Sequence, residues 1–293
     1  MRRVALAALA AALTAAIIAA CGGSTPVAPT SSGSGTGGSG GGTPNTPPTI
    51  KSIAVSDTRI EVGTPVTLTA TVEDAETPVD NLTYQWTAAT GTFSGTGRVV
   101  TWTAGADAVT PADFPLRLTV TEHTAGSTAV VNTVTASVTV HVNNSPKELA
   151  DLSLRFLGDF ADSRISPDTC VSEFSNTCKS GKADEFSNIS DNRHDFQILS
   201  STLRTSSVDW VPVRANATVH TFCHFESLIL HTPANCSSAD CPVGTVQKVE
   251  GDCYTTDIYE NGRWWLCESH FNGVRVLSAL ERAFFGIRRP EIP

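Results

Sequence analysis

The sequence lacks several features that would assign it to a well-marked class of protein. It has no cluster of lysine and arginine, and its 20 basic residues are outnumbered by 29 acidic ones. Nucleic-acid-binding proteins need basic clusters to neutralise phosphates, so we expect no nucleic-acid partner. There is also no serine nucleophile elbow, no phosphate-binding loop and no metal-chelating helix motif, which leaves those enzyme classes without support. We therefore expect no cofactor and no metal centre.

Long apolar runs are absent after residue 20. The one such run, residues 4–20, follows Met1-Arg2-Arg3 and ends in Ile18-Ala19-Ala20-Cys21. A charged start, an apolar middle and small residues at the exit are typical of a secretory signal peptide, so residues 1–20 are predicted to be one. The Ile-Ala-Ala-Cys ending resembles the lipobox of bacterial lipoproteins. That resemblance implies cleavage before Cys21 and acylation of Cys21.

The lipoprotein interpretation predicts where the protein works. It places the chain in the bacterial cell envelope, held to the membrane through the lipid on Cys21. Gly22, in place of an aspartate, favours the outer membrane if the cell has one. Two other interpretations are a transmembrane anchor and an ordinary signal with an incidental cysteine. An alanine-rich run of this length is at the lower edge of what spans a bilayer.

Residues 21–48 consist almost entirely of glycine, serine, threonine and proline. Such a segment cannot bury enough apolar surface to offset the conformational entropy that ordering would cost. We predict a disordered linker with a reach on the order of 30 Å.

Residues 49–143 alternate apolar side chains with threonine at a period of two, as in Val66, Leu68 and Ala70. Several short alternating strands separated by glycine turns indicate an antiparallel β-sandwich. The segments Leu82-Thr83-Tyr84-Gln85-Trp86-Thr87 and Val99-Val100-Thr101-Trp102-Thr103 resemble strands of bacterial immunoglobulin-like and polycystic-kidney-disease-type (PKD) domains. No cysteine occurs here, so the inter-sheet disulfide of antibody domains is missing, and Trp86 is expected to fill the core. We expect this sandwich to act as a spacer.

One loop of this region is acidic. Asp74, Glu76 and Asp80 are its candidate cation ligands. Calcium takes six to eight oxygen ligands that converge on one point. Three acids beside Pro78 do not supply that set, so a solvated loop is predicted.

Residues 146–293 begin differently. The run Ser145-Pro146-Lys147-Glu148 is typical of a capping box with proline at the first helical position, and it predicts a helix to about residue 160. A second helix is predicted at 182–194, burying Ala183, Phe186 and Ile189. Four strands are predicted to follow, at 196–204, 216–228, 245–259 and 263–271. Asn261-Gly262, between the last two, is a strong hairpin signal.

Helices followed by a curved antiparallel sheet that ends in Gly262-Arg263-Trp264-Trp265-Leu266 resemble the nuclear-transport-factor-2-like α+β cone fold. The predicted fold class is therefore multidomain: an all-β immunoglobulin-like sandwich followed by an α+β cone-like domain with helices packed on a curved sheet. The cone family includes isomerases, dehydratases and non-catalytic binding modules, so the fold does not choose among these functions.

The cysteines after Cys21 all lie between residues 170 and 267. The bacterial envelope is oxidising, so disulfides are expected. If the hairpin that joins 216–228 to 245–259 is centred near Ser238, Cys223 falls almost opposite Cys253, and Cys236 faces Cys241.

Three cysteines then remain. Cys170–Cys178 would close a loop between the helices, and Cys267 would stay as a buried, inert thiol. A zinc site built from the four hairpin cysteines is the alternative, because four thiolates suit zinc. Strand pairing would place the two hairpin pairs about 40 Å apart, which disfavours that alternative.

Candidate catalytic residues are few. His220 and His224 share a strand face but lie roughly 13 Å apart, too far to share one metal. They could line a concave pocket in a cone fold. The residues to test first are Asp195, Asp209, His220 and Tyr259. We predict that the C-terminal domain, residues 146–293, binds a surface ligand or an envelope protein without catalysis. The alternatives are a small-molecule enzyme of the cone class, isomerase- or dehydratase-like, and a purely structural envelope protein.

Overall fold

The structure, a computed structural model, describes residues 45–212, 214–234 and 236–275. The predicted signal peptide, Cys21, most of the predicted linker and residues 276–293 lie outside this part of the chain, so the predictions for them stay predictions. Strands predominate in the described residues, as the sequence indicates, and they form three four-stranded sheets. None of the helices in these residues is long and apolar enough to cross a membrane.

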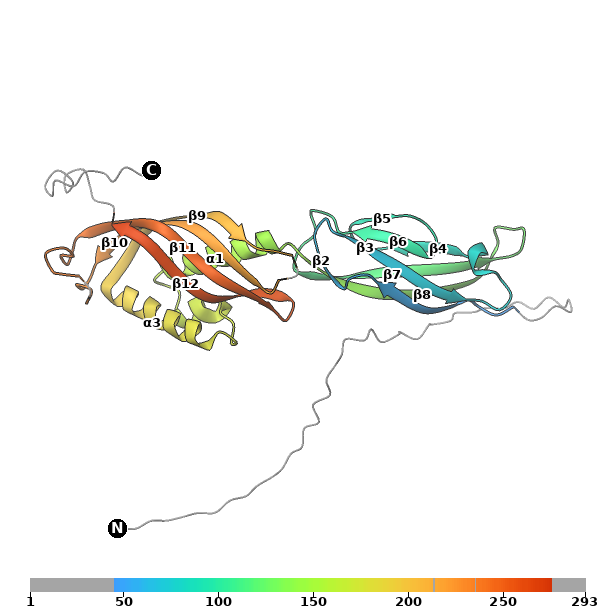
Figure 1. Ribbon diagram of the computed structural model, residues 1–293, viewed down its shortest axis with the longest axis horizontal. Helices are drawn as coiled ribbons and strands as arrows, with labels where there is room; N and C mark the ends of the chain where they lie inside the picture. The colour runs from blue at the N-terminus through green and yellow to red at the C-terminus, as the bar shows by residue number, and fades with distance from the viewer. Residues whose placement is uncertain (1–44, 213, 235, 276–293) are drawn as a thin grey trace, which may run out of the picture.

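Two of the sheets belong to residues 45–143, which we call the N-terminal half (Figure 1). The first is antiparallel, with the order β1 (Thr49–Val55), β3 (Pro65–Glu73), β6 (Val99–Thr103) and β5 (Thr92–Ser94). The second has the order β2 (Arg59–Glu61), β8 (Val130–Asn143), β7 (Ala112–His123) and β4 (Thr83–Thr87), with β2 parallel to β8. A 3-10 turn, η1 (Val79–Asn81), precedes β4.

These two sheets pack face to face around a shared core. Every second residue of β3 is buried, which is the periodicity that the sequence shows. Val66 and Trp102 of the first sheet belong to the same buried cluster as Leu116 and Val140 of the second. Trp102 is fully buried, whereas Trp86 packs against the cluster while half-buried. Trp86 therefore packs into the core as expected, although Trp102 is the tryptophan that is fully buried there.

Residues 144–275, the C-terminal half, fold as helices against one long antiparallel sheet. The helices are α1 (Ser145–Ala161), α2 (Pro167–Cys170) and α3 (Lys179–Asp195), with a 3-10 turn, η2 (Val171–Glu173), after α2. The sheet has the order β12 (Arg263–Arg275), β11 (Val246–Glu260), β10 (Asn216–Ile229) and β9 (Phe196–Asp209). It curls around α1 and α3, which cover one of its faces (Figure 1). We call that covered face the concave face and the opposite one the outer face.

Helix α1 begins one residue earlier than the capping box predicts. Asn144 is the N-cap residue, and its backbone N–H donates to Oε1 of Glu148 at 2.7 Å. Ser145 is fully buried instead of capping. Its hydroxyl donates to Oε1 of Glu61 at 2.7 Å and accepts a hydrogen bond from Nε1 of Trp264 at 2.9 Å. Local sequence rules assign the Ser145 hydroxyl to the helix cap, but in the structure it forms these long-range hydrogen bonds instead.

Helix α3 is rotated relative to the prediction. Ile189 is fully buried as expected, but Ala183 and Phe186 are exposed, and Glu185 is buried beside Ile189. The helix has little apolar character on any side, so its apolar residues do not determine which side faces the sheet. The orientation of α3 is set by its attachment to β12.

The hairpin between β11 and β12 forms at the predicted dipeptide. Asn261 and Gly262 have φ angles of 53° and 81°, and Glu260 pairs with Arg263 across the turn. Two consecutive positive φ values are the pattern for which Asn-Gly is favoured.

Three disulfides lie in the C-terminal half. Cys223–Cys253 and Cys236–Cys241 are bonded in the structure, as the sequence spacing suggested. The strand register differs by two residues from the expected one, because Cys223 pairs with Gly251 and so reaches Cys253 diagonally. The zinc alternative is excluded for these four sulfurs, since each is already bonded to another.

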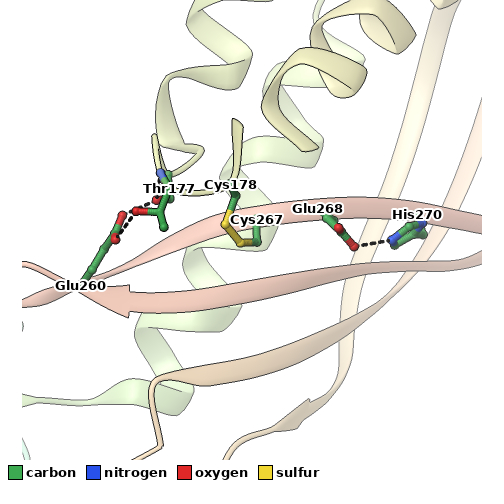
Figure 2. Close-up of a disulfide and its surroundings, with 7 residues drawn as sticks. Thr177, Cys178, Glu260, Cys267, Glu268 and His270 are labelled. Carbon is green, nitrogen blue, oxygen red and sulfur yellow. Dashed lines mark hydrogen bonds and ion pairs between the residues drawn. A yellow bond between two sulfur atoms is a disulfide. The ribbon is translucent and has the colours of Figure 1, made fainter. Parts of the chain in front are cut away.

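The predicted Cys170–Cys178 bond is wrong. Cys178 is bonded to Cys267 (Figure 2). Cys170 is a buried free thiol. The residues before Cys178 lie against β12: Phe174 forms a parallel bridge with Leu266, and the Ser175 N–H donates to the Leu266 carbonyl at 2.8 Å. This contact brings Cys178 to β12 and away from Cys170.

Cys267 also lies differently from the prediction. A register shift in β11–β12 pairs Thr256 with Glu268 and Asp257 with Leu266, so Cys267 is the extra residue of a bulge. A bulge re-aims a side chain out of the regular alternation. Gly181 of α3 allows the close approach, since a Cβ there would lie 2.0 Å from the Cys267 carbonyl oxygen.

Candidate functional site

A cavity of about 370 Å³ lies between α1, α3 and the concave face of the sheet. Its walls are mainly apolar, from α1, β9, β10 and β11: Phe156, Phe160, Phe196, Ile198, Phe225 and Val249. A smaller set of polar residues comes from α3, β10, β11 and β12: Glu185, Asn188, Ser227, Gln247, Thr255 and Ser269. This size and this mixture of an apolar lining with a few polar groups are typical of a small-molecule site.

Glu185 is the charged group most deeply set in this cavity. It is 5% exposed, and burial raises the pKa of its carboxyl group above the ordinary value. Hydrogen bonds from Ser269 and Asn188 and the charge of His270 act in the opposite direction. Sequence reasoning missed Glu185 because it expected another side of α3 to be buried. No pattern within α3 distinguishes Glu185 from its acidic neighbours.

A second carboxyl group, Asp257, lies deeper on the concave face. It is 2% exposed, and its Oδ2 accepts a hydrogen bond from Thr255 at 3.0 Å, while Oδ1 has no partner among the described residues. Burial raises the pKa of Asp257 to about 8. The group is therefore mostly protonated at neutral pH. Because Thr255 lines the cavity, its hydroxyl connects the cavity wall to this acid.

The predicted pocket residues of β10 are on the other face of the sheet. Val219, Cys223 and Phe225 are buried on the concave face, so His220 and His224, which alternate with them, point to the outer face. Side chains alternate along a strand, and a shift of one residue in the inward set moves every side chain to the opposite face. The expectation that His220 and His224 line the concave pocket is wrong.

On that outer face His220 is surrounded by acids and aromatic rings. Its Nδ1 lies 2.7 Å from Asp252 and its Nε2 lies 3.8 Å from Asp209. Tyr254 stacks between His220 and His270, with ring centroids 5.6 Å and 4.7 Å away. Asp209 and His220 are thus brought together as candidates, but away from the concave face and its buried carboxyl groups.

Tyr259 has a structural position between the two halves of the chain. Its hydroxyl donates to Oδ1 of Asn143 at 2.8 Å, and the Arg59 guanidinium lies 3.3 Å from the centre of its ring. Burial raises the pKa of Tyr259, with the charge of Arg59 opposing. Next to it, Nε2 of His141 in β8 contacts the Gly262 carbonyl oxygen at 2.9 Å. These contacts join the end of β8 to the β11–β12 hairpin.

Asp195 is the last residue of α3, apart from the other three candidates. Its carboxylate contacts Nδ1 of His194 at 2.9 Å, and His231 stacks on His194 with ring centroids 4.2 Å apart. The four residues singled out from the sequence therefore occupy three separate places and do not form one site.

The acidic loop of the N-terminal half does not converge on a cation. Oδ1 of Asp74 accepts hydrogen bonds from the backbone N–H groups of Glu76 and Thr77, at 2.9 and 2.6 Å. Asp80 pairs instead with Arg98 at 3.1 Å. Asp74 closes the turn and is half-buried, whereas Glu76 and Asp80 are exposed.

No protein-family model matches the chain, and no curated protein matches it. Among solved structures, a conserved protein from Planctomyces limnophilus DSM 3776 is similar over 44% of this chain and 98% of that chain, with 14% sequence identity and a TM-score of 0.33. A likeness at this TM-score is too weak to transfer a fold or a function.

Proposed function

We propose that this chain is a lipoprotein of the bacterial cell envelope whose C-terminal half binds a small, largely apolar ligand in the cavity under α1 and α3. The cavity itself carries this proposal: about 370 Å³, apolar walls and one buried carboxyl group. An apolar ligand gains from leaving water, and a hydrogen-bond donor on it would satisfy Glu185. Binding in this proposal involves no chemical change of the ligand.

The architecture proposed around this site has two domains. Residues 49–143 would be an immunoglobulin-like or PKD-type sandwich, supported by two sheets that share one core. Residues from 146 onward would be a cone-like α+β domain, supported by two helices held in a curled sheet with its own core. The sandwich would act as a spacer between the membrane and the ligand site, since the two halves lie end to end (Figure 1).

Filling the cavity should abolish binding. We expect Ser227→Phe, which adds a ring to the cavity wall, to weaken binding of N-phenyl-1-naphthylamine at least tenfold. This apolar probe carries one N–H donor and fluoresces when it leaves water, so its titration into the purified, detergent-solubilised protein measures the site. Uptake by micelles is common to all variants and cancels in the comparison.

Ser207→Phe is the matched control, because Ser207 is exposed and pairs with His220 on the outer face. It should bind the probe as the wild type does. Val249→Phe is a second filling variant, in case Ser227→Phe perturbs folding. Equal probe affinity in the wild type and in a folded filling variant would refute ligand binding in this cavity.

The anchoring part of the proposal has its own test. Cys21→Ser should abolish fatty-acid labelling and release the protein from the membrane fraction, because the lipid is its proposed membrane contact. Labelling with a fatty-acid analogue, followed by fractionation, measures both. A Cys21→Ser protein that still carries fatty acid would disprove the lipoprotein assignment. The serine substitution at Cys170, a buried free thiol, is the control and should leave labelling unchanged.

One observation favours a second function, a small-molecule enzyme of the cone class. A carboxyl group with a raised pKa in an apolar cavity is suited to proton transfer, and Glu185 is such a group. The two functions differ in the fate of the ligand. A ligand that co-purifies and is recovered unchanged after incubation supports binding alone. A product that accumulates with the wild type but not with Glu185→Gln would support the enzyme.

A further inference from the structure

Three potential metal ligands meet where α3 ends. A ring nitrogen of His194, a carboxylate oxygen of Asp195 and a ring nitrogen of His231 all lie within 4.8 Å of one another. Among the described residues this is the one group of histidine, cysteine and acidic side chains with such spacing. His194 and Asp195 end α3, whereas His231 follows β10, so the fold has brought them together from distant parts of the chain.

The backbone holds this arrangement firmly. The N–H groups of Leu230 and His231 both donate to the Asp195 carbonyl oxygen, at 2.8 and 3.2 Å. The loop after His231 is closed by the Cys236–Cys241 disulfide, and the Thr232 hydroxyl donates to the Cys241 carbonyl at 3.2 Å. Ligands fixed before the metal arrives lose little entropy on binding it.

Hydrogen bonding leaves a free lone pair on His231. Its Nδ1 lies 2.6 Å from the His194 carbonyl oxygen, which can only accept, so Nδ1 carries the proton and Nε2 has the lone pair. Metal-binding histidines commonly donate their second nitrogen to a backbone carbonyl or a carboxylate in this way. The Nδ1 atom of His194 lies 2.9 Å from an Asp195 carboxylate oxygen, so these two potential ligand groups are already in contact.

We propose that His194, Asp195 and His231 bind a divalent transition-metal ion of the zinc type. Two imidazoles and one carboxylate suit Zn²⁺, Ni²⁺ or Cu²⁺ better than Ca²⁺ or Mg²⁺, which prefer oxygen ligands. Zinc ligands in one tetrahedron lie roughly 3.4 Å apart, so no two of the three groups have to approach each other by more than about 1.4 Å. The His194 side chain is 68% exposed, so solvent surrounds much of its ring.

The site borders the proposed ligand cavity without depending on it. Asn192 and Phe196, on either side of the pair in sequence, line the cavity. Three protein ligands leave at least one coordination position open, as in zinc sites that bind a further molecule. The sequence predicts no metal centre, because it contains no metal-chelating helix motif. His194 and His231 are 37 residues apart, and only the fold brings them together.

The test uses the purified full chain, freed of metal with a chelator and titrated with Zn²⁺ by calorimetry. We expect binding of one Zn²⁺ with loss of at least tenfold in affinity in His231→Asn and in His194→Asn. Asparagine places an amide N–H near the position of Nδ1, so it preserves the existing hydrogen bond but removes the Nε2 ligand. The metal-free melting temperature should therefore stay within a few degrees of that of the wild type.

His123→Gln is the control, because His123 lies at the end of β7 in the N-terminal half. It should bind Zn²⁺ as the wild type does. Co²⁺ supplies a second measurement, since its visible absorption should show nitrogen ligands in the wild type and lose them in both asparagine variants. Wild-type protein that binds no Zn²⁺, or asparagine variants that bind it with unchanged affinity, would overturn the proposal.

Discussion

Removing the disulfide between Cys178 and Cys267 should cost about 4–5 kcal/mol of the free energy of unfolding. The bond joins residues 89 positions apart, and the stabilisation that a disulfide gives by restricting the unfolded chain grows with the loop it closes. Both cysteines are replaced by serine together, so that no unpaired thiol remains. Urea unfolding under non-reducing conditions measures the loss.

The matched control is the double serine substitution at Cys236 and Cys241. These residues are only five positions apart, so the same loop-entropy relation gives about 2 kcal/mol for their bond. Equal losses in the two double variants would contradict the expected dependence on loop length. Peptide mapping of the unreduced protein provides a direct check. Recovery of Cys170 linked to Cys178 would reject the pairing in Figure 2.

The second large effect concerns Asp257 and pH. In the unfolded chain its carboxyl group ionises near 3.8, whereas burial raises the pKa of Asp257 to about 8 in the folded protein. Between these values the unfolded state has lost a proton that the folded state keeps. The stabilisation that the protonated Asp257 gives to the folded state is therefore fully present below about pH 4. It decreases as the pH rises and is lost above about pH 8.

Asp257→Asn should remove this pH dependence. At pH 8 the variant should be more stable than the wild type by roughly 5 kcal/mol, because unfolding no longer releases a proton from this site. At pH 4 the two proteins should be nearly equal. Urea unfolding at pH 4, 6 and 8 measures the difference.

Asp184→Asn is the control for this series, since Asp184 is exposed on α3. Its substitution should leave the pH profile close to that of the wild type. A wild-type profile retained in Asp257→Asn would mean that the Asp257 carboxyl ionises normally in the folded protein. The Asp257 carboxyl group also contacts the cavity wall, because it accepts a hydrogen bond from Thr255, which lines the cavity.

Local patterns predicted a large part of the secondary structure. The alternation in β3, the Asn-Gly hairpin and the order of helices before strands at the C-terminal end all follow from residues close together in sequence. Such signals depend on backbone geometry and on burial of one strand face, and both act over a few residues. The capping-box prediction is wrong at Ser145, whose hydroxyl forms hydrogen bonds with Glu61 and Trp264 instead of capping the helix.

The candidate site was much less predictable. Side chains of β10 alternate between the two faces of the sheet, so either His220 or Cys223 faces the helices, but not both. The alternating polar and apolar residues of this strand do not show which set is covered until the packing partner is known. Glu185 is buried because α3 is bonded to β12 through Cys178, which no local rule specifies. The pairing of Cys178 with Cys267 depends in turn on a bulge that re-aims Cys267.

Local sequence patterns specify the β-rich character of the chain, the main strand positions and the disulfides of the β10–β11 hairpin and its connecting loop. These depend on neighbours along the chain or directly across a hairpin. Long-range packing, in contrast, determines which face of the sheet is covered, which acids are buried and where His194 and His231 meet. Those outcomes depend on contacts between residues far apart in sequence, whose energies no short pattern contains. His194 and His231 become candidate ligands for this reason alone: α3 and β10 end at the same place.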